Sequence, residues 1–455
     1  MLTKLAYAAA TALVLIASAA PAEARVGALT QLPGKAGCVA QQNSSASVRR
    51  QCAVARFAGN QLWDLAVSPD GRNLYVASIG GAVSVLRIHH GGLTQLPRKT
   101  GCFSRTGSFG CTRWPALNKA NEVVVGPDGR AVYVGANGGV VIFGRNQKTG
   151  ALRKIGCVGE DGRNGCTSLR TPLGGITGLA VTHDGHNVYA ASGGVVVALR
   201  RGHRGGLSQM IGNAGCMNAD GSSFCTRARG LLPGCCGIAI SPRSDNVYLS
   251  SSHFPTPDSA HFALAAFARD TRGILMQLPG AAGCVNQDGG DGCTAVAFNG
   301  DEPENTAGDI VISPNGRNLY VAHSSTFPTA EAAICGASEN FIAMFPRDPN
   351  AGTLGPLGQD IGACGSIPAL SSDGRSMYGV TGNFGNELSI FSRNRSTGLL
   401  SAAGCIDPND SRCQKARHLP APSSAAITPN GRYVFVISDD PAFGETIGVF
   451  KRSLR

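Results

Sequence analysis

The 455-residue sequence lacks the short motifs that mark several large enzyme classes. It contains no GxSxG nucleophile elbow, no phosphate-binding loop and no GxGxxG dinucleotide fingerprint, which argues against the corresponding hydrolases and nucleotide-binding enzymes. The HExxH spacing of many zinc proteases is also absent. Function must therefore be sought in the architecture and in residues that it brings together.

Long apolar runs are absent after the first 20 residues. The chain opens with Lys4, an Ala- and Leu-rich run over 5–20 and small residues around 22–24, which is the layout of a cleavable secretory signal. The run is shorter than the roughly 20 residues that span a bilayer. We predict a signal peptide over 1–24, no transmembrane segment, and a mature chain over 25–455 that is secreted to the periplasm or the extracellular space.

The sequence has 16 cysteines but lacks the close CxxC spacing of structural zinc sites. In an exported chain, regularly spaced cysteines predict disulfides. The pairs that bracket a single turn are Cys38–Cys52, Cys102–Cys111, Cys157–Cys166, Cys216–Cys225, Cys284–Cys293 and Cys405–Cys413. We predict no metal and no cofactor.

The sequence does contain one phrase that occurs seven times: a strand, a tight turn and a second strand centred on Tyr. The first copy reads AVSPDGRNLYVAS at 66–78, and the last reads AITPNGRYVFVIS at 426–438. The turns lie 56 to 72 residues apart, at Gly71, Gly129, Gly185, Ser244, Gly316, Gly374 and Gly431. A repeat of this length supplies one four-stranded blade. We predict an all-β fold, a single-domain seven-bladed β-propeller with antiparallel blades.

A fourth-strand segment at 27–34 precedes the first blade, and the chain ends just after a third strand. We expect this N-terminal strand to become the outer strand of the last blade and to close the ring. The same topology places the cysteine loops on one face, which we call the top. It also brings Cys335 and Cys364 together there, which predicts a further disulfide.

The SPDGRNLYVAS phrase and the IFxRNxxTGxL turns resemble the YVTN type of propeller repeat and the lactonase family of seven-bladed propellers. That family includes 6-phosphogluconolactonase and carboxymuconate cyclase-like proteins. The resemblance covers almost the whole mature chain and implies a lactone hydrolase, if the protein is an enzyme. Phosphorylated sugar lactones are cytosolic, so an exported relative is expected to act on a different lactone or sugar-acid-like molecule.

Three carboxylates share one register of the repeat. Asp64, Glu122 and Asp309 each stand at the start of an innermost strand, at the top mouth of the channel. Like charges held close together raise the pKa of at least one carboxyl group, which suits a general base or a cation ligand. We name them candidate catalytic residues. The alternative is that each caps its own loop or pairs with an arginine.

Four arginines share a second register, four residues after the second cysteine of a top loop: Arg56, Arg170, Arg229 and Arg417. If their side chains point inward, they form a rim that binds a carboxylate or the oxyanion of an opening lactone. If they point sideways, they join loop carbonyls of neighbouring blades. Both interpretations are consistent with the sequence.

Long insertions on the fourth and fifth blades are candidate binding loops, because function tends to lie on long loops of a rigid scaffold. They bring His253, His261 and His323 to one sector of the top face. Nearby, Cys235 and Cys236 are adjacent, and a bond between them would form either a flat plate under a ligand or a structural lock. Quinone-dependent propeller dehydrogenases use such a plate, but this chain has only two tryptophans and lacks their Trp-rich blades.

The formal net charge is +11. Arginines in the turns predict a positive bottom face, which gives an alternative function: a non-catalytic extracellular scaffold that binds an acidic polymer. The strands lack the aromatic and basic pattern of nucleic-acid binding proteins, so no nucleic-acid partner is expected. We expect a monomer whose partner is either this polymer or a small-molecule ligand.

Overall fold

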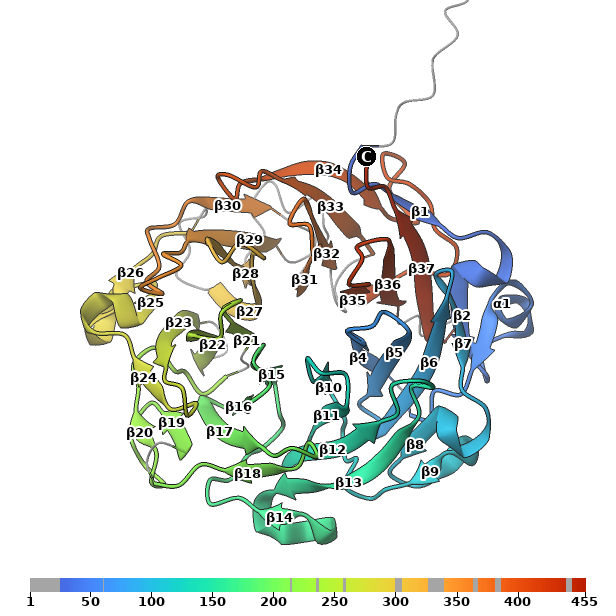
Figure 1. Ribbon diagram of the computed structural model, residues 1–455. Helices are drawn as coiled ribbons and strands as arrows, with labels where there is room; N and C mark the ends of the chain where they lie inside the picture. Colours follow the sequence, from blue (N-terminus) through green and yellow to red (C-terminus); the bar gives the residue numbers. More distant parts are fainter. Residues whose placement is uncertain are drawn as a thin grey trace, which may run out of the picture.

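The computed structural model describes residues 25–59, 61–212, 215–234, 237–256, 259–298, 305–325, 339–362, 367–380, 386–438 and 444–455. In these residues the strands form seven sheets that surround a common centre like blades (Figure 1). The predicted all-β seven-bladed propeller is confirmed. The predicted signal peptide lies outside the described residues. None of the described helices has the length and apolar character needed to cross a bilayer.

Each blade begins with an innermost strand and continues outward through antiparallel neighbours. The innermost strands, which encircle the centre in Figure 1, are β4 (Leu62–Val67), β10 (Glu122–Val125), β15 (Gly178–Val181), β21 (Ile238–Ile240), β27 (Asn305–Ile312), β31 (Ile367–Leu370) and β35 (Pro422–Ile427). The second strands are β5 (Asn73–Ser78), β11 (Ala131–Ala136), β16 (Asn187–Ser192), β22 (Asn246–Thr256), β28 (Asn318–Ser325), β32 (Ser376–Val380) and β36 (Tyr433–Ser438).

The outer half of each blade contains a third strand and a fourth strand that is often split in two. The third strands are β6 (Ala82–His89), β12 (Gly139–Arg145), β17 (Val195–Arg201), β23 (Ser259–Arg269), β29 (Glu339–Pro346), β33 (Leu388–Arg393) and β37 (Thr446–Arg452). The fourth-strand segments of blades 1 to 6 are β7 (Gly92–Gln95) and β8 (Cys102–Ser104), β13 (Leu152–Gly159), β18 (Leu207–Gln209) and β19 (Cys216–Asn218), β24 (Leu275–Gln277) and β25 (Cys284–Asn286), β30 (Gln359–Gly362), and β34 (Leu400–Ile406).

The N-terminal strands belong to the same sheet as the last strands of the chain. β1 (Leu29–Gln31) and β2 (Cys38–Gln41) both pair antiparallel with β37, so that Leu29 faces Arg452 and Cys38 faces Gly448. The single α-helix of the described residues, α1 (Ala46–Gln51), lies in the loop that follows β2 and starts at Ser45, whose hydroxyl accepts the Val48 N–H.

Five described blades have one strand more than the predicted four. After each cysteine loop the chain turns back and pairs in parallel with the outer strand, forming β3 (Ala53–Ala55), β9 (Thr112–Arg113), β14 (Thr167–Ser168), β20 (Thr226–Arg227) and β26 (Thr294–Ala295). A disulfide explains this reversal, because it holds the two ends of the loop together. In four of these blades a Cys-Thr pair starts the added strand, a sequence signal that the four-strand prediction did not use.

The repeated SPDG turn is held by its own side chains. In the first blade the Ser68 hydroxyl donates to Asp70 Oδ1 at 2.6 Å and accepts the Asn73 N–H at 3.0 Å. Gly71 has a φ of 67°, a left-handed conformation that favours glycine. The turn therefore fixes the start of the second strand, whose tyrosine, Tyr75, is fully buried.

A tyrosine and an arginine lie between the neighbouring blades on the bottom side at every junction except that of blades 7 and 1. Between blades 1 and 2, Arg145 Nε donates to the Tyr75 hydroxyl at 2.7 Å, and Arg145 Nη2 contacts Asp70 at 2.8 Å and Asn73 at 2.6 Å. The Tyr75 hydroxyl in turn donates to the Gly150 carbonyl at 2.9 Å. We call this arrangement the Tyr–Arg unit. The bond from Nε to the tyrosine recurs with Tyr133 and Arg201, Tyr248 and Arg347, and Tyr320 and Arg393. Arg269 and Arg452 occupy the same place beside Tyr189 and Tyr378 but use Nη2, which donates to Asn187 and to Ser376, respectively.

The junction between blades 7 and 1 replaces the whole unit with apolar groups. Phe435 stands where the other blades have Tyr, and Ile88 stands where they have Arg, because each lies at the same register of the strand pairing. Tyr433 also replaces the asparagine, and its ring packs against Gly91 so closely that any Cβ there would collide with it. All three belong to one hydrophobic cluster. A buried arginine without a carboxylate or hydroxyl partner would destabilise the fold. At this junction the arginine and the tyrosine are therefore replaced together.

We predict that the Tyr–Arg unit contributes strongly to the free energy of unfolding, and that its members contribute together and not independently. Arg145→Ala should lower the free energy of unfolding by about 3–5 kcal/mol, because it leaves the Asp70 carboxylate and the Tyr75 hydroxyl without their partner. The triple variant Asp70→Asn, Tyr75→Phe, Arg145→Ile imitates the junction of blades 7 and 1 and should cost less than the single variant. Urea denaturation measures both.

The exposed Arg72, two residues from Asp70, is the matched control. Arg72→Ala should change the free energy of unfolding by no more than about 0.5 kcal/mol. A triple variant that is less stable than Arg145→Ala would contradict the cooperative interpretation.

Candidate functional site

The three candidate carboxylates act on one another across the top of the channel. Asp64 lies on β4 of blade 1, Glu122 on β10 of blade 2 and Asp309 on β27 of blade 5. The three residues are half-buried. The negative charge of Asp309 raises the pKa of both Asp64 and Glu122. The structure therefore brings together the acidic residues that the repeat register predicts.

The strand pairing is irregular beside two of these carboxylates. The register of β4 shifts between Leu62 and Asp64, and that of β27 shifts between Ala307 and Ile310, around Asp309. A third shift occurs on β35, just before Ser424. Extra residues of this kind re-aim side chains and are frequent beside active sites. They were not predicted, because a one-residue insertion leaves no trace in the spacing of the repeat.

Asp64 is held by three neighbouring blades. Its Oδ1 accepts the Leu65 N–H at 2.7 Å, and its Oδ2 accepts the Val123 N–H of blade 2 at 2.8 Å. Ser424 of blade 7 also donates a hydrogen bond to this carboxylate. Asp64 is therefore fixed in orientation, as a catalytic group must be.

The surroundings give the three groups unusual proton affinities. Burial raises the pKa of Asp64 to about 7, and the charge of Asp309 adds to the rise, while the N–H groups of Val123 and Leu65 oppose it. Burial alone raises the pKa of Asp309 to about 6. Burial and the charges of both aspartates raise the pKa of Glu122 well above its ordinary value. Near neutral pH the cluster thus contains both a proton donor and a proton acceptor.

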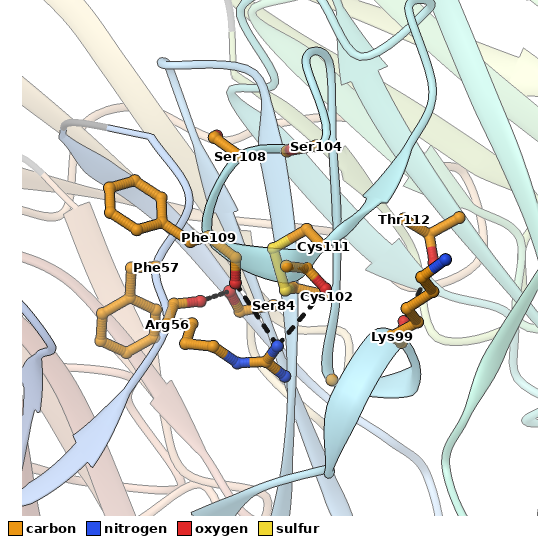
Figure 2. The surroundings of a disulfide bond; sticks show 12 residues. Arg56, Phe57, Ser84, Lys99, Cys102, Ser104, Ser108, Phe109, Cys111 and Thr112 are labelled. Carbon is orange, nitrogen blue, oxygen red and sulfur yellow. Dashed lines mark hydrogen bonds between the residues drawn. A yellow bond between two sulfur atoms is a disulfide. The ribbon is translucent and has the colours of Figure 1, made fainter.

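The four candidate arginines do not form an anion-binding rim. Arg56 Nη2 donates to the Arg98 carbonyl at 2.5 Å, and Nη1 reaches the carbonyls of Phe109 and Gly110 beside the Cys102–Cys111 disulfide (Figure 2). Gln95 accepts the Arg56 backbone N–H at 2.8 Å. The other three make equivalent bonds to a glutamine and to loop carbonyls: Arg170 to Gln209 and Met210, Arg229 to Gln277 and Gly280, and Arg417 to Gln31 and Leu32. These contacts agree with the second interpretation, in which the arginine side chains join loop carbonyls.

The candidate histidines are separated. His323 is 2% exposed and lies among Phe262, Phe298 and Phe341, with its Nε2 2.8 Å from Asp360 Oδ1. A ligand cannot reach this imidazole without moving those rings, so the structure gives it a packing role. The half-buried His253 pairs across the β22–β23 hairpin with the exposed His261.

Six of the predicted disulfides are present: Cys38–Cys52, Cys102–Cys111, Cys157–Cys166, Cys216–Cys225, Cys284–Cys293 and Cys405–Cys413. Cys235, Cys236, Cys335 and Cys364 lie outside the described residues. Glu387 approaches Cys405 and Cys413 with metal-like spacing, but the sulfur atoms are already bonded to each other. This group is therefore unsuited to hold an ion.

The top face of blade 2 contains a polar cavity of about 240 Å³, next to the Cys157–Cys166 disulfide. Asn118, Asn137 and Glu160 line it together with a run of glycines. Asn118 lies only four residues before Glu122 in the chain. The cavity thus places amide groups, which can form hydrogen bonds, on the same face as the carboxylates.

We predict that Glu122 destabilises the folded protein as the pH rises. A carboxyl group whose pKa is raised by folding binds its proton more tightly in the folded state, so stability falls as the pH rises through the folded pKa. Glu122→Gln should therefore increase the free energy of unfolding more at pH 9 than at pH 6, measured by urea denaturation. The exposed Glu160 is the control, and Glu160→Gln should give equal effects at both pH values. A Glu122→Gln effect independent of pH would contradict the assignment.

No protein-family model matches the chain, and no curated protein matches it by sequence. Solved structures of similar shape include a periplasmic gluconolactonase of Pseudomonas aeruginosa, which is 17% identical with a TM-score of 0.51 over 75% of this chain and 84% of that one. A protein from Lactobacillus plantarum is 17% identical with a TM-score of 0.52, over 76% of this chain and 84% of its own. Hydrazine synthase of Kuenenia stuttgartiensis is 14% identical with a TM-score of 0.52, over 88% and 98%.

At identities this low, the likeness concerns the fold, which supports many unrelated activities. It agrees with the resemblance carried by the SPDGRNLYVAS phrase. In architecture, the chain is a seven-bladed β-propeller, the fold that it shares with the periplasmic gluconolactonase and the protein from Lactobacillus plantarum.

Proposed function

We propose that this protein is an exported lactonase-like hydrolase that binds and opens a small lactone at the top of the channel. The observation that carries the proposal is the trio Asp64, Glu122 and Asp309, which combines a proton acceptor and a proton donor near neutral pH. Hydrolysis of an ester ring needs both roles.

Two of the three carboxyl groups, Asp64 and Glu122, have a direct role in the proposed reaction. Ionised Asp64 accepts a proton from a water molecule, whose oxygen forms a bond to the lactone carbonyl carbon. Protonated Glu122 donates a hydrogen bond to the carbonyl oxygen, on which negative charge develops. When the tetrahedral intermediate collapses, the bond from the carbonyl carbon to the ring oxygen breaks, and the proton held by Asp64 passes to that oxygen. The product is a hydroxy acid, and Asp64 is ionised again.

The charge of the site favours a neutral substrate. The arginines Arg56, Arg170, Arg229 and Arg417 are engaged in loop contacts, so the described cluster offers carboxylates and no adjacent guanidinium. A phosphorylated sugar lactone would be repelled, whereas a neutral lactone would not. The newly formed carboxylate of the product would be repelled in turn, which favours its release.

Export is part of the proposal. The N-terminal run over 5–20 has the layout of a secretory signal, and six disulfides suit an oxidising compartment. The similarly folded gluconolactonase of Pseudomonas aeruginosa is described as periplasmic. An extracellular or periplasmic lactone is therefore the expected substrate.

We predict that purified mature protein hydrolyses a neutral aldonolactone such as glucono-δ-lactone, or a simple aliphatic lactone, and that Asp64→Asn lowers kcat by about 100-fold or more. Because Asp64 must be ionised, the rate should rise with pH around 7 and fall at higher pH, where Glu122 loses its proton. Measuring the rate by proton release in a pH-stat gives the profile.

Asp288→Asn, at an exposed carboxylate in the Cys284–Cys293 loop of blade 4, is the matched control and should keep the wild-type rate. If Asp64→Asn and the wild type open every lactone of a panel at the uncatalysed rate, the hydrolase proposal fails, and the alternative of a non-catalytic extracellular scaffold gains support.

A further inference from the structure

The positive charge of the chain is concentrated in one segment. Residues 25–121 contain 12 Lys and Arg but only two acidic residues, Asp64 and Asp70, whereas residues 122–455 contain 27 basic and 26 acidic residues. Almost the whole net charge of +11 thus belongs to blade 1 and the N-terminal part of blade 7.

Folding gathers this charge on the outer rim between blades 7 and 1. The exposed side chains lie on three adjoining loops: the turn Gly34–Gly37, helix α1, and the loop from Arg98 to Arg113. Helix α1 contacts the first turn, which contacts β7, and in Figure 1 α1, β2, β7, β8 and β9 lie side by side at the rim. We call the exposed groups the basic sector: Lys35, Arg49, Arg50, Arg98, Lys99 and Arg113.

The loops of the basic sector are fixed to one another. The Cys38–Cys52 disulfide holds the loop with α1, and Cys102–Cys111 holds the next loop. Arg56 crosses between them and donates to the Arg98 carbonyl, and Thr112 Oγ1 donates to the Lys99 carbonyl at 3.1 Å (Figure 2). The charged groups are thus arranged before any partner arrives, which lowers the entropy cost of binding.

The two acidic residues of the segment do not neutralise the basic sector. Asp64 lies in the channel, where it accepts the Val123 N–H, and Asp70 forms its ion pair with Arg145 on the bottom face. On the bottom face, third-strand arginines such as Arg145, Arg269 and Arg452 pair with aspartates, while the turn arginines Arg317, Arg375 and Arg432 are exposed.

The distribution of exposed apolar side chains argues against a membrane as the partner. The most exposed ones, Ile211 at 90% and Phe224 at 79%, lie on blade 3, away from the basic sector. Near the sector, Val54 and Phe109 are only 48% and 43% exposed. A membrane-binding surface combines basic residues with strongly exposed apolar anchors, and here the most exposed apolar side chains lie on another blade.

We propose that the basic sector binds an extended acidic polysaccharide outside the cell, independently of the hydrolase site. Six cations spread over three rigid loops fit a chain of regularly spaced carboxylates better than one compact anion. The rim also leaves the channel mouth open, so a bound polymer would hold the protein in place without covering Asp64.

The test measures binding of polygalacturonate to the full mature protein by isothermal titration calorimetry at low salt. The variant Arg49→Glu, Arg50→Glu, Lys99→Glu should weaken binding at least tenfold. Raising the salt concentration should weaken binding by the wild type more than binding by the variant, because exposed charges are screened.

The matched control reverses three exposed arginines of the bottom turns, Arg317→Glu, Arg375→Glu and Arg432→Glu, which changes the net charge equally. It should bind as the wild type does. Equal weakening by both triple variants, or no binding by the wild type, would overturn the proposal. Binding only to phosphatidylglycerol vesicles, and not to polygalacturonate, would overturn it in favour of a membrane. Circular dichroism of each variant confirms that it is folded, and lactone hydrolysis is scored separately.

Discussion

The buried ion pair between neighbouring blades is the interaction on which the rest of the structure depends. A propeller has no core at its centre, so each blade must be fixed to the next by its faces and edges. Packing of the apolar faces is not directional, so it does not fix the relative orientation of two blades. The Tyr–Arg unit does fix it, because Arg145 contacts a hydroxyl, a carboxylate and an amide of the preceding blade at once. Such a fork of donors accepts only one relative orientation of two blades.

The top and the bottom of the ring use arginine for the same task in different ways. On the bottom the guanidinium groups are buried and rely on aspartate and tyrosine. On the top they are partly exposed and bind backbone carbonyls of loops that disulfides have already shaped, as Arg56 does beside Cys102–Cys111. Together the two sets hold a ring in which burial raises the pKa of both Asp64 and Asp309, which by itself is unfavourable for folding at neutral pH.

Much of the fold was predictable because the repeat encodes it in sequence spacing. The SPDG turn, the buried tyrosine and the regular cysteine pairs each depend on local chemistry, and the structure contains them. The convergence of Asp64, Glu122 and Asp309 followed from the same register. The orientation of Arg56 did not, because it depends on Gln95 and on carbonyls some 40 to 54 residues away. The burial of His323 depends on aromatic side chains of two neighbouring blades, Phe298 and Phe341, which no single repeat reveals.

The apolar junction between blades 7 and 1 gives the ring one seam of a different kind. Hydrogen bonds to Asp70, Asp128, Asp184 and Asp373 outweigh their burial and hold the pKa of each below its ordinary value, so acid removes the carboxylates on which several junctions rely. Phe435 and Ile88 have no titratable group, so acid does not change their contacts. In acid, the seam where the two ends of the chain meet would thus keep its contacts while those four junctions lose their carboxylates, and opening would begin inside the chain and not at its ends.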